Sequence, residues 1–159
     1  AGMQPSVALN YSSRAGNGLA GVGWNISTGA ALTRCPATTA QDGYVGSVSF
    51  TTNDKLCLNG QRLINISGSY GQTNTRYKLE IDNFTIVTQK AGSLDSSSAY
   101  FEVVYPNGRK EYFGSEVDSR ITPSGITNSL TWLLDKTQDV SGKNHMSYRY
   151  IDFGHGEKL

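Results

Sequence analysis

The chain has 159 residues, with 14 basic and 13 acidic side chains and a formal net charge of +1. This is the length of one ordinary domain, and the balanced charge excludes the electropositive surface typical of proteins that bind nucleic acids or anionic membranes. Only 17% of the residues are charged whereas 18 residues are glycine, a composition that favours strands and turns over helices.

The first predicted element is a strand at residues 7–11, where apolar residues alternate with small or polar ones. Gly16, Gly18 and Gly21 follow it with the G-x-G-x-x-G spacing of a dinucleotide-binding turn, which binds a pyrophosphate only where a helix begins directly after the glycines. Residues 22–26 instead alternate with a period of two and predict a second strand. We therefore interpret the glycines as a strand-to-strand connection with positive φ angles, and we expect no cofactor.

The two cysteines, Cys35 and Cys57, have two interpretations. A disulfide would close a loop of about 23 residues and contribute about 3 kcal/mol in the chain-entropy model. Two buried thiols are the alternative, although the polar, glycine-rich composition suggests an extracytoplasmic protein and so favours the disulfide. A metal site is not expected, because His145 and His155 lie far away in the sequence and no C-x-x-C motif is present.

Hairpins are predicted along the middle of the chain. Residues 55–58 and 61–64 flank an Asn-Gly dipeptide, which is typical of a two-residue type I′ turn. Alternating residues predict another strand pair at 77–81 and 84–88. The segment between these pairs, 67–74, is rich in Gly, Ser and Asn and predicts an exposed loop.

The last third of the chain predicts two more hairpins. Residues 100–105 and 109–113 are rich in aromatic side chains and are joined through a Pro-Asn-Gly turn. Residues 129–137 and 145–152 form a similar unit. No segment has a sustained helical period, so any helix should be a single turn. We therefore predict an all-β fold of antiparallel hairpins that form a sandwich or an open shell-type sheet.

Ten short motifs, spread over nearly the whole chain, together resemble one family. They are GMQP (2–5), ALNYSS (8–13), GNG (16–18), GVGW (21–24), TRCP (33–36), QDG (41–43), LCLNGQRL (56–63), YPNGR (105–109), YFG (112–114) and WLLDK (132–136). These motifs resemble the SpvB-type N-terminal domain, which begins the toxin-complex B components and many YD-repeat (Rhs-like) bacterial proteins. One departure from the family pattern is Lys143, which separates Gly142 from Asn144.

The resemblance implies a noncatalytic structural role. In toxin complexes this region looks like the start of a β-sheet shell that encloses a toxic C-terminal polypeptide. We accordingly expect residues 1–159 to be a single SpvB-like N-terminal β domain and a fragment of a longer, secreted or cell-surface, bacterial virulence protein. Its expected partners are other domains of that protein or toxin-complex subunits, with no nucleic acid and no membrane insertion by this segment. An open sheet would leave at least one strand edge unpaired.

Enzymatic chemistry is not expected. Some members of the family carry an ADP-ribosyltransferase domain, but its Glu-x-Glu pair is absent, and the serines at 96–98 are simplest to interpret as a polar loop. His145 with Asp135 and Asp139 suggests a hydrolase triad only weakly, because no nucleophile motif accompanies them. The acidic residues are too isolated in the sequence for a calcium site.

The residues that we expect to matter are therefore structural. The glycines would shape the first connection, the tryptophans would anchor apolar faces, and the cysteines would join neighbouring strands: Gly16, Gly18, Gly21, Gly23, Trp24, Trp132, Cys35 and Cys57. The nine tyrosines and two tryptophans also suggest an alternative, an extracellular β-sandwich module that binds carbohydrate or mediates adhesion. Packing in the core and pairing across strands are the simpler interpretation of these aromatic residues.

Overall fold

The computed structural model describes residues 8–11, 17–18, 21–22, 24–27, 30–81 and 84–151, with only the backbone before residue 30. The chain divides into two compact units, Ala1–Ala30 and Ala31–Leu159. In the first unit, β1 (Ala8–Tyr11) pairs with β4 (Trp24–Ser27), and β2 (Asn17–Gly18) pairs with β3 (Gly21–Val22), both antiparallel. The strands predicted on both sides of the glycines are confirmed, because Gly21–Val22 continues as strand and not as helix.

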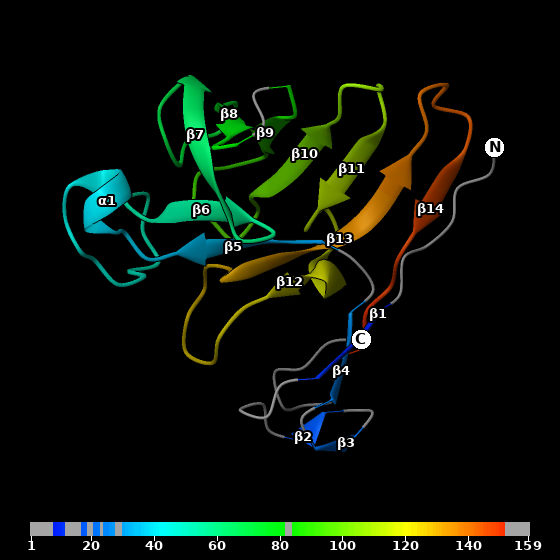
Figure 1. The fold of residues 1–159 in the computed structure, drawn as a ribbon, viewed down its shortest axis with the longest axis horizontal. Helices are drawn as coiled ribbons and strands as arrows, with labels where there is room; N and C mark the ends of the chain where they lie inside the picture. The colour runs from blue at the N-terminus through cyan, green and yellow to red at the C-terminus, as the bar shows by residue number, and fades with distance from the viewer. Residues whose placement is uncertain are drawn as a thin grey trace. The chain divides into compact units, whose positions relative to one another are not determined.

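The second unit is a closed antiparallel barrel (Figure 1). Each strand pairs with the next along the chain, and β13 pairs with both β5 and β11, which closes the sheet. The barrel strands are β5 (Ala31–Cys35), β6 (Lys55–Leu58), β7 (Gln61–Ser67), β8 (Arg76–Leu79), β9 (Ile86–Lys90), β10 (Tyr100–Val104), β11 (Lys110–Phe113) and β13 (Thr131–Gln138). The prediction of an all-β fold from antiparallel hairpins is confirmed, but the sheet is a closed barrel and not a sandwich or an open sheet.

The length of β13 explains the closure. Its first half pairs with β5, in the register Trp132↔Leu32, and its second half pairs with β11, in the register Lys136↔Tyr112. Two short strands, β12 (Arg120–Ile121) and β14 (His145–Ser147), pair with the same strand. Every barrel strand therefore has a paired neighbour on each side, and the fully unpaired edge that an open sheet would leave is not found in the barrel.

The interior of the barrel is filled by side chains. Burial alternates along the strands, so that every second residue faces inward. The largest fully buried side chains are Trp132, Tyr77, Phe101, Phe113, Leu32, Leu56, Leu63 and Leu94. A barrel of about eight strands has an interior just wide enough for such side chains. The described barrel is accordingly a packed core.

The predicted hairpins are present, with differences at their ends. The Asn59-Gly60 turn has φ angles of 51° and 82°, the left-handed values that a type I′ turn requires, and it joins β6 to β7. Strand β8 ends two residues before the predicted end and β9 begins two residues after the predicted start, because their ladder ends at Lys78↔Ile86. Ile81 and Phe84, which continue the sequence alternation, lie beyond it and are 82% and 78% exposed.

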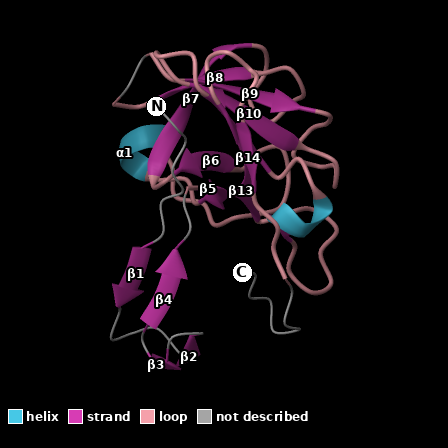
Figure 2. Cartoon of the chain, turned by 90° about the vertical axis from the view of Figure 1, so that its right-hand side faces the viewer, coloured by secondary structure: helices cyan, strands magenta, loops and turns pink. Residues whose placement is uncertain are grey.

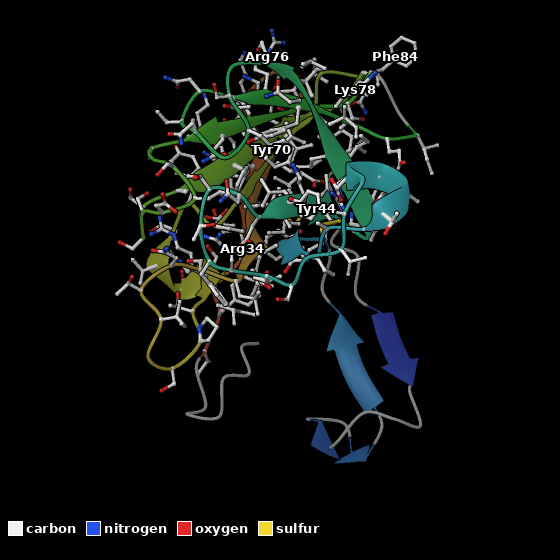
Figure 3. All side chains as sticks on the ribbon, turned by 90° about the vertical axis from the view of Figure 1, so that its left-hand side faces the viewer. Arg34, Tyr44, Tyr70, Arg76, Lys78 and Phe84 are labelled. Carbon is white, nitrogen blue, oxygen red and sulfur yellow. A yellow bond between two sulfur atoms is a disulfide. The ribbon has the colours of Figure 1, made fainter. Side chains whose placement is uncertain are left out.

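The segment at 67–74 was predicted to be an exposed loop, and this is only partly correct. Most of its residues are exposed, but Gly71 is buried, because its N–H donates to the Tyr77 hydroxyl and its carbonyl accepts from the Gln89 side chain. Tyr70 also packs into the molecule, as Figure 3 shows. Hydrogen bonds to the buried side chains of Tyr77 and Gln89 therefore hold this loop against the barrel.

Helices are confined to single turns, as predicted. The structure describes α1 (Thr39–Asp42) and a 3-10 turn, η1 (Val117–Ser119). Strands and loops make up nearly all of the rest (Figure 2). No helix in the described part of the chain is long and apolar enough to cross a membrane.

Candidate functional site

Trp132 lies at the centre of the barrel core. Its indole Nε1 donates to the carbonyl of Ala99 at 2.8 Å, and its ring packs edge-to-face on Phe101 with 5.0 Å between centroids. Gly114 lies directly against the indole with a φ of 71°, and a Cβ atom at this position would be 2.2 Å from Trp132 Cδ1. The glycine therefore allows both the left-handed backbone and the close approach of the ring.

Arg34 is a charged residue that faces the barrel interior. Its side chain is completely buried, and its guanidinium lies near the rings of Phe50 and Trp132, at 5.4 Å and 5.7 Å from their centroids. The guanidinium donates to Asp54 and to the backbone carbonyls of Ser129, Thr51 and Leu94. Because these acceptors belong to separate loops, one side chain holds together the loops at this end of the barrel.

Asp54 is the counter-ion of Arg34, with Oδ2 2.8 Å from Nη1. Its carboxylate also accepts from the backbone N–H groups of Ser49 and Phe50, both at 2.7 Å, and from the Ser49 hydroxyl at 2.8 Å. Burial alone would raise the pKa of Asp54, but the hydrogen bonds from Ser49 and the Arg34 charge outweigh it and hold the pKa below its ordinary value. The Asp54 carboxylate thus accepts four hydrogen bonds, two at each oxygen.

Cys35 and Cys57 form a disulfide between β5 and β6, with their Cα atoms 6.0 Å apart. The two residues are diagonal neighbours, because the register pairs Cys57 with Thr33. The bond lies on the outer face of the barrel, opposite to the interior positions Leu32 and Leu56. The disulfide, which the sequence favoured over two buried thiols, is therefore present in the structure.

The segment around α1 covers this outer face. Arg62 on β7 donates to both carboxylate oxygens of Asp42 at 2.9 Å and to the carbonyl of Pro36 at 3.0 Å. Gln41 donates to Glu80 at 2.8 Å, which adds a contact to the end of β8. The side chain of Arg62 is consequently buried between the outer face of the barrel and the α1 segment, and not in the barrel interior.

Tyr70 separates β6 from β7. These strands pair only at Cys57↔Arg62 and Leu58↔Gln61. At the next pair of positions the Tyr70 hydroxyl accepts from the N–H of Leu56 at 2.8 Å and donates to the carbonyl of Leu63 at 3.0 Å. Burial raises the pKa of this hydroxyl well above its ordinary value. A side chain thus replaces the direct ladder hydrogen bond and spreads the two strands apart.

A pocket of about 360 Å³ opens beside this gap. It lies between the α1 segment and the strands β6 and β7, and its lining includes Asp42, Lys55, Arg62, Ile64, Tyr70 and Glu80. The Lys55 ammonium lies 4.6 Å from the centroid of the Tyr70 ring. The pocket therefore combines charged groups of both signs with apolar side chains.

Asp135 is a second buried carboxylate, on β13. It accepts from the Ser115 hydroxyl and from the N–H of Glu116 at 3.0 Å, while its Oδ1 atom has no hydrogen-bond partner in the described part of the chain. Burial raises the pKa of Asp135 despite these hydrogen bonds. Arg149 lies 3.6 Å from Glu116 and 3.7 Å from Asp118 nearby, so these two carboxylates share one guanidinium.

The structure places the other predicted residues as follows. Gly18 and Gly21 are register partners in the β2–β3 pair, whereas Gly16, Gly23 and the side chain of Trp24 lie outside the described residues. Within the described ranges, no hydrogen bond or ion pair joins His145 to Asp135 or Asp139, and His145 is an exposed residue of β14.

The serines at 96–98 lie in a loop between β9 and β10, as predicted, where the hydroxyls of Ser96 and Ser98 bond to that loop's own atoms. No group of three His, Cys, Asp or Glu residues that could bind a metal is found in the part of the chain that the structure describes.

Sequence reasoning missed the charged residues that organise the fold, namely Arg34, Asp54, Arg62 and Asp135. A signal was available for Arg34, because the strand alternation places it on the same face as Leu32. A charged side chain on an interior face predicts a buried partner. Its partner Asp54 lies 20 residues further along the chain, in a loop whose position only the tertiary structure gives.

The comparison with family models matches residues 1–155 to the family described as SpvB, Salmonella virulence plasmid 65kDa B protein. No significant match is found among curated proteins. The N-terminal domain of the effector protein SpvB from Salmonella typhimurium is similar in structure, with a TM-score of 0.70 and 20% identity, over 94% of this chain and 50% of that chain.

Two toxin-complex structures are similar as well. The TcdB2-TccC3 structure matches with a TM-score of 0.70 and 21% identity, over 94% of this chain and 7% of that chain. The Tc holotoxin pore of Photorhabdus luminescens matches with a TM-score of 0.67 and 20% identity, over 92% of this chain and 7% of that chain. At these identities the likeness concerns the fold, and the chain spans half or less of the length of each relative.

Proposed function

The chain belongs to the SpvB family, and from this premise we propose that it is a noncatalytic structural domain of a secreted bacterial toxin-like protein, of the YD-repeat or toxin-complex type. In this proposal residues 1–159 are one domain of a longer polypeptide, and the domain contributes to a β shell that encloses or delivers a toxic polypeptide. Its partners are the other domains of that polypeptide or toxin-complex subunits. The similarity of this chain to a small part of TcdB2-TccC3 supports this assignment.

The filled barrel is the observation that carries the proposal. The largest buried side chains, Trp132, Tyr77 and Phe101 among them, occupy the interior, so the described barrel encloses its own core and not a cargo. A toxic polypeptide would therefore be enclosed by a larger assembly, in which this barrel is one rigid part of the wall. The disulfide and the buried Arg34–Asp54 pair supply the rigidity that such a part needs.

Four of the described tyrosines favour this role over carbohydrate binding. A sugar-binding platform uses aromatic faces together with free hydroxyls. The hydroxyls of Tyr70, Tyr77, Tyr105 and Tyr150 instead donate to protein acceptors, namely Leu63, Gln89, Glu111 and Leu134. These hydroxyls stabilise the fold, which is what a structural domain requires of them.

The experiment that tests the proposal uses the longer polypeptide that contains this chain. The polypeptide is prepared with and without residues 1–159 and treated with a nonspecific protease, and the survival of its C-terminal toxic part is followed by mass spectrometry. We expect the toxic part to be protected in the intact polypeptide and digested at least about tenfold faster after the deletion, because open states are cleaved in proportion to their population. Equal digestion rates would contradict a role in the shell.

A further inference from the structure

The pocket between the α1 segment and β7 contains hydrogen-bond donors that the fold does not use. Its two carboxylates are already engaged: Asp42 accepts from Arg62 and from the N–H of Thr38, and Glu80 accepts from Gln41. The Nε atom of Arg62 has no hydrogen-bond partner among the described residues. It is buried, and only 4% of this side chain is exposed. A buried donor without an acceptor is costly, so its position favours an acceptor supplied from outside.

Lys55 provides a second uncommitted donor. Its ammonium stacks on the Tyr70 ring at 4.6 Å and takes part in no ion pair within the described residues. Lys55 and Arg62 line the same pocket. Two cationic donors that line one pocket without a shared acceptor are suited to a carboxylate, with which both form charge-assisted hydrogen bonds.

The backbone of β7 also suits a ligand that is an extended polypeptide. The N–H of Glu80 donates to the carbonyl of Arg62, so Arg62 presents its backbone to β8. Because backbone groups alternate along a strand, Leu63 and Asn65 present theirs to the opposite side. Pairing with β6 ends at Arg62, and both residues line the pocket. The Leu63 carbonyl already accepts from the Tyr70 hydroxyl, so the backbone groups of Asn65 are the ones that this short edge offers to another extended chain.

Apolar side chains adjoin this edge. Ile64 lines the pocket and is 37% exposed, and Ile66, two positions further along β7, is 43% exposed. Ile64 points outward from the barrel, as strand alternation requires, and Ile66 lies at the irregularity of the β7–β8 register between Asn65 and Ser67. Exposed isoleucines beside this short stretch of β7, which lies beyond its pairing with β6, suit a partner that carries apolar side chains on either side of its polar contact.

We propose that this pocket binds an extended polypeptide segment with a glutamate or aspartate flanked by apolar residues. The carboxylate accepts from Arg62 Nε and from Lys55, the segment's backbone pairs with β7 at Asn65, and its apolar side chains cover Ile64 and Ile66. This inference goes beyond the structural role proposed above, because it assigns a specific recognition site and holds whether or not the longer protein encloses a toxin.

The test uses two acetylated and amidated tripeptides, Val-Glu-Val and Val-Gln-Val, which differ only in the charge of the central side chain. Each is titrated into the 15N-labelled 159-residue chain, and amide chemical shifts are followed by NMR. We expect a saturable shift at Asn65 and an affinity at least about fivefold higher for the glutamate peptide. Equal affinities, or no saturable shift with either peptide, would overturn the proposal.

Variants separate this pocket from general electrostatic attraction. Lys55→Gln should abolish the preference for the glutamate peptide, whereas Lys78→Gln, a matched change on the outer face of β8, should preserve it (Figure 3). Equal losses in both variants would show nonspecific attraction and overturn the proposal. Glu80→Gln provides a second readout that retains Lys55 and its stacking contact: removing a negative charge from the pocket should strengthen binding of the glutamate peptide, and an unchanged affinity would count against the site.

Discussion

The guanidinium of Arg34 lies 2.8 Å from the carboxylate of Asp54, and neither side chain is more than 3% exposed. Removing one partner of such a pair leaves the other charge buried without compensation. We predict that Arg34→Met destabilises the chain by about 3–5 kcal/mol, since it also frees the carbonyls that Arg34 binds. Urea unfolding followed by circular dichroism measures this loss.

Arg109→Met is the matched control for this prediction. Arg109 forms an ion pair with Glu111 at 3.2 Å, but its side chain is 44% exposed. An exposed pair of this kind contributes less than about 1 kcal/mol. If the two methionine variants lose similar, small amounts of unfolding free energy, Arg34 does not organise the loops as described.

The contact between Gly114 and Trp132 predicts a difference between two glycine substitutions. Gly114→Ala would place a Cβ atom 2.2 Å from Trp132 Cδ1, whereas at Gly125, with a similar φ of 79°, a Cβ would meet nothing within 4 Å. Both variants incur about 1–2 kcal/mol for the left-handed backbone. Gly114→Ala should lose at least about 2 kcal/mol more, because the core must shift. Thermal and urea unfolding of the two variants test this, and equal losses would contradict the packing at Trp132.

The disulfide predicts two results. Alkylation of the denatured chain without reductant should leave both Cys35 and Cys57 unmodified in an intact-mass measurement. The double variant Cys35→Ala and Cys57→Ala should unfold with about 3 kcal/mol less free energy, because the bond closes a loop over a sequence separation of 22. Labelling of both thiols in the unreduced protein would refute the bond.

Asp135 predicts a pH dependence of its own. Burial raises the pKa of Asp135 above its ordinary value of 3.8 in the folded chain, so the folded state holds this proton more tightly than the unfolded state. The stability that this group contributes is therefore complete below the unfolded pKa and is lost as the pH rises through the folded pKa. Asp54, whose pKa is lowered in the folded chain, contributes stability that is lost as the pH falls through its folded pKa.

The variant Asp135→Asn isolates this contribution. Relative to the parent chain it should gain unfolding free energy as the pH rises above 3.8, and the gain should level off once the parent carboxyl is ionised. Urea unfolding at a series of pH values measures the difference. A difference that does not change with pH would show that the pKa of Asp135 is not raised in the folded chain.

The sequence predicts the parts of the fold that depend on residues close together in the chain. The Asn59-Gly60 turn and the aromatic hairpin at β10 and β11 (Tyr100–Val104 and Lys110–Phe113) depend on neighbouring residues, and both are confirmed. Closure of the barrel depends on β13, which pairs with β5 about a hundred residues earlier in the chain, as in Thr131↔Thr33. No local pattern specifies such a contact, so the closed barrel was not predicted.

The candidate site likewise has parts that local sequence signals predict and parts that depend on distant contacts. The cysteine pair was found because two cysteines in a polar, glycine-rich chain allow few alternatives. The pocket beside β7 was missed because it arises where Tyr70, from a loop predicted to be exposed, inserts its hydroxyl between Leu56 and Leu63. Glycine and serine around Tyr70 predict a turn correctly, but they do not reveal that the aromatic residue among them is drawn into the sheet.

β11 and β13 close the sheet around a filled core, and native-state hydrogen exchange can detect this closure. The amide of Gly114 donates to Leu133 across this closure at 3.0 Å, and the amide of Gln89 donates to Thr75 within the sheet at 2.9 Å. We predict that both amides exchange only through global unfolding, with the same free energy of opening. Exchange of the Gly114 amide at a much lower free energy, with Gln89 still protected, would show an open sheet and contradict the closed barrel.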